Sequence, residues 1–302
     1  MAHLYQNYQG CMRFRQKSHL KPEQSGSKLA LPPDQAHDPS ITASKGSLEM
    51  SAALKVASGM SDAEWHTRCE LAALYHVCND LGWTDLINTH MSARVPGEPD
   101  HFLINNYGEM FDEITASSLV KMDMDGNVLS PGGKFNNAGF IIHSGVYKAR
   151  PDAMCVLHTH TRAGAGVSLI EKGLRPISQD ALGIYDDVAY HEYGVPATVE
   201  ECEALGRTCA GGAGCIILLN HGLLTLGPTI HGTFFRLYNL ERACELELLA
   251  RQMRIEPAPI SDYVIGKAAE RGKKRRNLPE YGLAEFKGLV RTVEKRGADY
   301  RH

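Results

Sequence analysis

The chain has 302 residues, of which 43% are hydrophobic and 22% charged, enough to bury a substantial core in one large domain or two small ones. A formal net charge of -3 at pH 7 gives no reason to expect nucleic acid or a membrane surface as partner, and no apolar run is long enough to span a bilayer. Eight cysteines are scattered without a C-x-x-C pair, which favours reduced thiols and a cytoplasmic location.

The N-terminal segment predicts no packed structure. Residues 1–22 carry four basic side chains and no acid, a composition that leaves an organelle-targeting segment as the alternative to a disordered tail. From residue 21 to about residue 50, small and polar residues dominate and large apolar side chains are few. We expect a disordered leader over residues 1–55, a folded domain over 56–255 and a C-terminal extension with a closing helix over 256–302.

The first half of the folded region predicts an antiparallel meander between two helices. The first helix begins at a capping box, in which Ser61 and Glu64 satisfy the free amides of the first turn. The second helix ends at Arg150, because Pro151 disfavours helical geometry in the residue before it. The expected elements are a helix from Ser61 to Gly82, strands over residues 85–95, 101–105, 119–123 and 128–130, and a helix from Gly133 to Arg150.

The second half predicts an alternation of strands and helices. Residues 273–276 are a run of four basic side chains, which we interpret as a solvated linker at this overall charge. The expected elements are strands over residues 154–160, 184–193 and 215–219, helices over 161–171 and 199–207, a long helix from Thr229, and a closing helix around Phe286.

Three histidines stand at the ends of predicted apolar strands. Side chains alternate faces along a strand, so His158 and His160 point to the same side. A second apolar strand delivers His221 at a glycine-containing turn. Three imidazoles with an open coordination position are typical of a catalytic metal site. Zn²⁺ is the first expectation, with Fe²⁺ and Mn²⁺ as alternatives, because the ligand types alone do not select the metal.

Two residues near this strand are candidates for supporting roles. His143 lies on the preceding helix, where it could hydrogen-bond a metal ligand or serve as a structural histidine. Arg162 directly follows the ligand strand, and its guanidinium suits a substrate carboxylate in bidentate fashion. An ion pair between subunits is the alternative for Arg162.

The chain resembles the class II aldolase/adducin head domain family over residues 61–253. The matching motifs are Ser92-Ala93-Arg94, Ala149-Arg150-Pro151-Asp152 followed by His158-Thr159-His160, and Asn220-His221-Gly222. This resemblance implies an α/β fold, a single three-layer α/β/α domain around a mostly antiparallel sheet. It also implies a homotetramer with active sites at subunit boundaries. In the catalytic members, zinc on the three histidines polarises a substrate carbonyl and stabilises the enediolate.

The resemblance also suggests a proton donor. In the family a tyrosine from the neighbouring subunit delivers the proton, and the matching segment here is residues 188–194. Tyr190 is the first candidate and Tyr193 the second. The alternative is that both are ordinary aromatic residues of a strand.

Departures from the family pattern bear on the substrate. Sugar-phosphate aldolases of the family place a glutamate, their general base, nineteen residues before the first ligand, and here that position is Gly139. Their phosphate pocket is altered as well, because His90, Gly108 and Asn137 stand in or beside its turns. We therefore expect an unphosphorylated substrate. His90 is a candidate for the base or for a substrate contact, with a structural role as the alternative, and Gly108 and Asn137 are candidates for lining the substrate pocket.

The leading hypothesis is a metal-dependent, aldolase-like lyase that acts on a small, unphosphorylated carbonyl compound. The first alternative is a three-histidine non-haem iron oxygenase or decarboxylase of the same fold. The second is a non-catalytic, adducin-like module for oligomerisation or interaction, which the missing glutamate favours and the complete histidine triad opposes.

Overall fold

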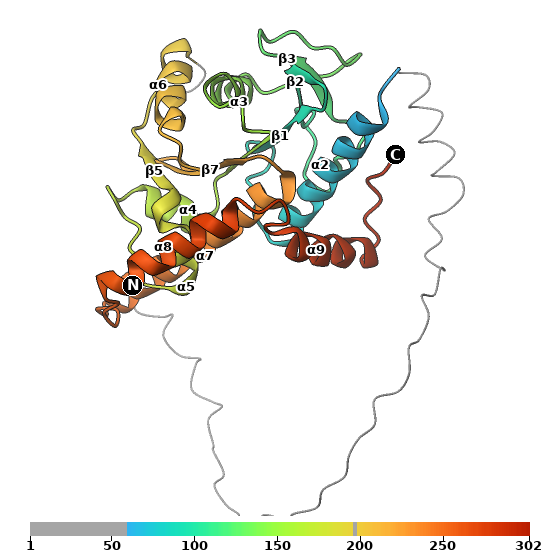
Figure 1. Cartoon of the computed structure of the whole chain (residues 1–302). Coiled ribbons are helices and arrows are strands. Elements are labelled where there is room, and N and C mark those ends of the chain that lie inside the picture. The colour runs from blue at the N-terminus through green and yellow to red at the C-terminus, as the bar shows by residue number, and fades with distance from the viewer. Residues whose placement is uncertain (1–58, 196–197) are drawn as a thin grey trace, which may run out of the picture. The chain divides into compact units, whose positions relative to one another are not determined.

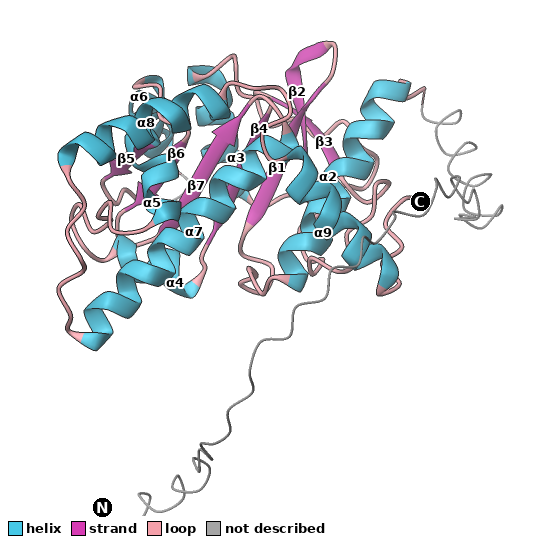
Figure 2. Ribbon diagram, turned by 60° about the horizontal axis from the view of Figure 1, so that its bottom comes forward, coloured by secondary structure: helices cyan, strands magenta, loops and turns pink. Residues whose placement is uncertain are grey.

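The computed structural model describes residues 59–195 and 198–302, so the leader expected over residues 1–55 lies outside the described residues. The centre of the fold is a seven-stranded sheet in the order β3-β2-β1-β4-β7-β6-β5 (Figure 2). Only β5 and β6 run parallel, and the other neighbouring strands are antiparallel, as predicted. The strands are β1 (His90–Val95), β2 (Glu98–Ile104), β3 (Val120–Asp123), β4 (Cys155–Thr159), β5 (Val188–His191), β6 (Cys215–Leu218) and β7 (Gly222–Gly227).

Helices cover both faces of this sheet (Figure 1). Val156 and Leu224 pack with α3 and α6 on one face, whereas Leu157 and Leu223 pack with α2 and α7 on the other. The alternation of buried strand residues therefore builds two cores, and the expected three-layer α/β/α fold is confirmed. The helices are α2 (Asp62–Asp80), α3 (Asn137–Ala149), α4 (Arg162–Ser168), α5 (Gln179–Ile184), the short 3₁₀ helix η1 (Tyr185–Asp187), α6 (Val199–Ala210), α7 (Ile230–Met253), α8 (Asp262–Arg276) and α9 (Leu283–Lys295).

The start of α2 realises half of the predicted capping box. The Ser61 hydroxyl accepts a hydrogen bond from the Glu64 amide at 3.1 Å. The Glu64 carboxylate, which is buried, pairs instead with Arg68 and Lys121, each at 2.9 Å. Arg68 also donates to the carbonyl oxygens of Ala116 and Leu119 and so ties α2 to the loop before β3. Glu64 therefore belongs to a buried ion network and does not complete the predicted cap.

Several predicted boundaries were wrong. The first strand begins at His90 rather than at residue 85, and the expected strand over residues 128–130 is reduced to a single bridge between Met122 and Val128. The basic residues 273–276 are not a linker but the last turn of α8. Lysine and arginine are good helix formers, and positive charge at a helix C-terminus is favourable, which explains this outcome.

Several elements were missed. Of the region predicted as a strand over residues 184–193, residues 184–187 belong to the end of α5 and to η1, and only residues 188–191 form β5. Strand β7 follows β6 after a three-residue turn, and Asn220 in this turn adopts a left-handed φ of 58°. Because this turn is so short, the sequence of β6 and β7 resembles a single apolar strand followed by a loop.

Among the described residues, no helix is both long and apolar enough to cross a membrane. The cysteines in the same ranges all carry free thiols, in keeping with the expected reduced state.

Glu241 on α7 generates a prediction about stability. Its carboxylate is 3% exposed and accepts a hydrogen bond from the Thr161 hydroxyl at 2.5 Å. Burial raises the pKa of Glu241 from 4.5 to about 7, so the folded state binds this proton more tightly than the unfolded chain. The free energy of unfolding should therefore fall as pH rises from about 4.5 to about 7, by on the order of 3 kcal/mol.

We expect Glu241→Gln to remove this fall. The variant should be more stable than the parent at pH 8, and the difference should shrink at pH 5. Urea denaturation at the two pH values measures both quantities. Glu285→Gln, which removes an exposed carboxylate of α9, is the control. A stabilisation that is the same at both pH values would contradict the prediction.

Candidate metal centre

The three predicted histidines come together in the middle of the sheet, where β4 ends and β7 begins. One ring nitrogen from each of His158, His160 and His221 lies within 4.8 Å of the others. The ring centroids are 4.6 to 4.8 Å apart. His158 is buried at the end of β4, and His160 and His221 are half-buried. His221 thus lies beside the His-x-His pair, and the role of the three rings as metal ligands stays a prediction.

Hydrogen bonds fix the tautomers of two of these rings. Nδ1 of His158 lies 3.0 Å from the carbonyl oxygen of Leu223, which can only accept, so this nitrogen donates. Nδ1 of His160 donates in the same way to the Asp85 carboxylate at 2.9 Å. In the neutral form of each ring Nε2 then carries a lone pair, and the two Nε2 atoms are 2.9 Å apart. Two such lone pairs repel, and a cation placed between them and His221 removes that repulsion.

Electrostatics favour the neutral form of His158 and His221, which is the form that can bind a metal ion. Burial lowers the pKa of His158 well below its usual value, and the neighbouring histidines lower it further. Burial, followed by the effect of His160, lowers the pKa of His221 to about 4. This donor set is thus better suited to a metal ion than to a proton. The residues present fit the divalent metal that the sequence predicts.

The turn between β6 and β7 places His221. The His221 amide bonds back to the Leu218 carbonyl at 3.1 Å, and the left-handed Asn220 lets the chain reverse. The next residue must be glycine, because a Cβ on Gly222 would lie 2.4 Å from the carbonyl oxygen of Thr159. The backbones of β4 and β7 can therefore approach each other closely, and this brings His221 to the end of β4.

His90 stands beside the triad. In the β1–β4 register it is directly opposite His158, and the two ring centroids are 5.1 Å apart. A Cβ on Gly139 would come 2.8 Å from Cδ2 of His90. The imidazole of His90 thus occupies the space next to position 139, where the resembling aldolases have their glutamate. Burial lowers the pKa of His90 well below its usual value.

A buried hydrogen-bond chain extends behind His90. Its Nδ1 lies 2.8 Å from Nε2 of His143, and Nδ1 of His143 bonds to the Ser92 hydroxyl. Ser92 in turn bonds to the Tyr147 hydroxyl at 2.8 Å. His143 therefore supports His90 and not a ligand of the triad, which refines the supporting role that we expected for it.

Three of these supporting residues were missed from the sequence. Ser92 and Tyr147 gave only a weak signal, as polar residues within an apolar strand and helix. Asp85 gave none, because it reaches His160 from a turn 75 residues away in the chain.

The remaining site candidates lie in different surroundings. Tyr190 packs with the core on the opposite face of the sheet from His158, and its hydroxyl accepts from the Leu174 amide at 3.1 Å. Tyr193 is 57% exposed, and its ring centroid is 6.2 Å from that of His221. Arg162 is exposed at the start of α4 and has no ion pair within the described ranges. Asn137 and Gly108 are both exposed, the first at the start of α3 and the second in a turn with φ of 106°.

Comparison with known proteins matches residues 69–248 to the family described as Class II Aldolase and Adducin N-terminal domain. The chain belongs to this family. A solved structure of an aldolase II superfamily protein from Pseudomonas syringae is 42% identical to it. That match covers 82% of this chain and 99% of the other, with a TM-score of 0.76. The fold expected from the three motifs is therefore shown by sequence and by structure.

Other members of the family differ in what their names describe. The solved L-fuculose 1-phosphate aldolase from Glaciozyma antarctica is 28% identical, with a TM-score of 0.69, and the match covers 80% of this chain and 93% of that one. Mouse alpha-adducin is 43% identical over 246 residues, which are 76% of this chain but 33% of the adducin. This family membership is thus compatible both with an aldolase-like enzyme and with an adducin-like module.

The close approach at Gly222 gives a prediction. Gly222→Ala should destabilise the fold by about 2 kcal/mol, because the new Cβ overlaps the Thr159 carbonyl and overpacking of this kind is costly. Gly266→Ala, on the exposed side of α8 with no atom within 4 Å of its Cβ, should instead stabilise by about 0.5 kcal/mol through helix propensity. Chemical denaturation measures both. A Gly222→Ala variant as stable as the parent would contradict the proposed packing.

Proposed function

We propose that this chain is a metal-dependent, aldolase-like lyase that acts on a small, unphosphorylated carbonyl compound. The observation that carries the proposal is the convergence of three imidazoles, with the Nε2 atoms of His158 and His160 2.9 Å apart and His221 beside them. Zn²⁺ is the metal that a neutral three-imidazole set suits first, and Fe²⁺ or Mn²⁺ are the alternatives.

His158, His160 and His221 would hold the ion. Asp85 and the Leu223 carbonyl orient two of the rings through their Nδ1 protons, as outer partners of metal ligands commonly do. When bound, the divalent ion supplies Lewis acidity to a substrate carbonyl oxygen. The rest of the chemistry belongs to the side chains around it.

His90 is the residue that we assign to proton transfer. It is neutral because of its burial, and it lies beside the triad in the space next to Gly139. His143 either donates to Nδ1 of His90 or accepts from it. In the second case Nε2 of His90 is free to take a proton from the substrate. The base that position 139 lacks is therefore supplied from β1.

Further groups would contact the substrate. The Arg162 guanidinium has no ion pair within the described residues and is suited to a substrate carboxylate. Tyr193 is the better placed of the two tyrosines within one chain, because its ring lies next to His221. Tyr190 can act as the proton donor only if it reaches the site of a neighbouring subunit. Asn137 and Gly108 stay candidates for the outer wall of the pocket.

The proposal includes a cytoplasmic homotetramer with sites at subunit boundaries. An exposed Tyr193 beside His221 supports it, because an aromatic residue at the open side of a site is well suited to meet another subunit.

Metal analysis tests the donor set. Protein purified without chelator should carry about one divalent transition metal per chain, and His158→Ala/His160→Ala should lose it. Asp85→Asn should weaken the affinity by about 10- to 100-fold, because the His160 ring loses its charged partner. The double variant His66→Ala/His302→Ala, which changes one exposed and one half-buried histidine outside the triad, should keep the metal. The proposal fails if the parent has no stoichiometric metal.

Activity measurements test His90. A screen for aldol cleavage, decarboxylation and oxygen consumption with Zn²⁺, Mn²⁺ or Fe²⁺ should first reveal turnover. His90→Ala should then lower kcat/KM by about 10²- to 10⁴-fold while the metal content is unchanged. Adding Gly139→Glu to this variant should restore part of the rate, because the carboxylate would fill the space that the imidazole leaves. Equal rates in the parent and His90→Ala would assign His90 a structural role.

The second candidate function is a non-catalytic, adducin-like module, which the 43% identity to mouse alpha-adducin favours. The same screen separates the two functions. Silence with every metal would favour the module, whereas oxygen consumption with Fe²⁺ alone would favour the oxygenase alternative over the lyase.

A further inference from the structure

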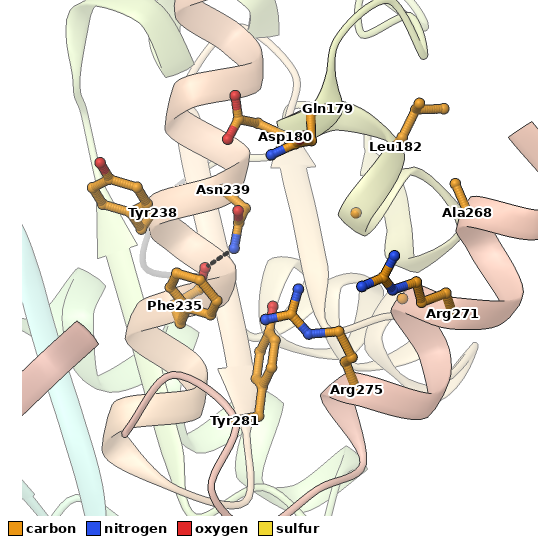
Figure 3. Close-up of a pocket in the computed structure, with 12 residues that line it drawn as sticks. Gln179, Asp180, Leu182, Phe235, Tyr238, Asn239, Ala268, Arg271, Arg275 and Tyr281 are labelled. Carbon is orange, nitrogen blue, oxygen red and sulfur yellow. Dashed lines mark hydrogen bonds between the residues drawn. The ribbon is translucent and has the colours of Figure 1, made fainter. Parts of the chain in front are cut away.

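A pocket formed by α5, α7 and α8 shares no residue with the histidine site (Figure 3). Its volume is about 430 Å³, within the range of small-molecule sites. It is lined by Gln179, Asp180, Leu182, Gly183, Phe235, Tyr238, Asn239, Ala268, Arg271, Gly272, Arg275 and Tyr281.

Two arginines of this pocket have no partner among the described residues. Arg271 and Arg275 lie one helical turn apart on α8, and their guanidinium groups extend toward α7. Neither side chain makes an ion pair or a hydrogen bond within the described ranges, and Asp180, which lines the same pocket, forms no ion pair with them. Like charges at this spacing repel each other and destabilise a helix slightly. An anion between the two guanidinium groups would attract both and outweigh their mutual repulsion.

The buried face of α8 shows that this helix can satisfy its charges. Arg276 is 5% exposed, pairs with Asp186 at 2.6 Å and with Asp187 at 3.2 Å, and donates to the Gly183 carbonyl. Arg271 and Arg275, by contrast, are exposed and make no such contacts within the described ranges, so both guanidinium groups are available to a ligand.

The facing wall of the pocket is aromatic. The rings of Phe235 and Tyr281 have centroids 5.1 Å apart, and Tyr238 stacks on Phe235 with an interplanar angle of 18°. The Tyr281 hydroxyl forms no hydrogen bond within the described ranges, and it points into the pocket beside Arg275. A ligand here would therefore meet guanidinium and phenol donors at one end and flat apolar surface next to them.

We propose that this pocket binds a small organic phosphate whose flat, apolar body packs against Phe235 and Tyr281 while its dianion lies between Arg271 and Arg275. Two forked guanidinium groups offer more donors than one carboxylate can accept, and a phosphate dianion has three terminal oxygens to receive them. The proposal is independent of the metal chemistry proposed for the histidines, because none of the residues is shared.

Isothermal titration of the full chain with phenyl phosphate tests the pocket. We expect saturable binding, tighter than that of inorganic phosphate because of the aromatic wall, and tighter than that of benzoate because of the second charge. Arg271→Gln/Arg275→Gln should weaken it by about tenfold or more. Lys273→Gln/Lys274→Gln removes the same charge from exposed positions of the same helix outside this pocket, and should change the affinity by less than about threefold.

The metal-site variant His158→Ala/His160→Ala should bind phenyl phosphate as the parent does. Loss of binding in that variant would place the ligand at the histidines and overturn the proposal. Equal losses in the arginine and lysine variants would reduce the effect to general attraction by a basic helix and would also overturn it. So would benzoate binding as tightly as phenyl phosphate, or no saturable binding tighter than about 10 mM in the parent.

Discussion

The Nε2 atoms of His158 and His160 face each other at 2.9 Å, and the rest of the site follows from that constraint. The Leu223 carbonyl and the Asp85 carboxylate each take an Nδ1 proton, so neither His158 nor His160 can turn its own N–H toward the other without losing a partner. Burial opposes a positive charge on His158, so a proton shared with that ring is disfavoured. This donor set therefore fits a metal ion, which is the cation that we propose for the site.

The sheet is what maintains this arrangement. The β4–β7 pairing delivers the Leu223 carbonyl to His158, and the glycine at position 222 allows the two backbones to approach closely enough for His221 to complete the set. The β1–β4 register then brings His90 next to His158 from a third strand. A shift of one residue in any of these pairings would turn the side chains to the opposite face. Site and fold therefore depend on the same hydrogen bonds.

Strand alternation and a glycine turn were enough to predict the triad, because both are local properties of the sequence. Tyr190 was proposed from the family resemblance as a residue supplied by a neighbouring subunit, and in its own chain it lies on the other face of the sheet from His158. The partners Asp85 and Ser92 depend on contacts across 75 and 51 residues, which no local pattern contains. The basic run of α8 was misjudged because charge was weighed above helix propensity.

The choice between enzyme and passive module can be argued from the cost of what is buried. His90, His143 and His158 are at most 3% exposed, and burial lowers the pKa of each, so the rings are neutral and need hydrogen-bond partners inside the protein. Apolar side chains of similar size would pack in these places without a need for matched hydrogen bonds. A module that used only its surface would have no need of such a network. Departures from the most stable packing of this kind are expected where a protein binds or transforms a ligand.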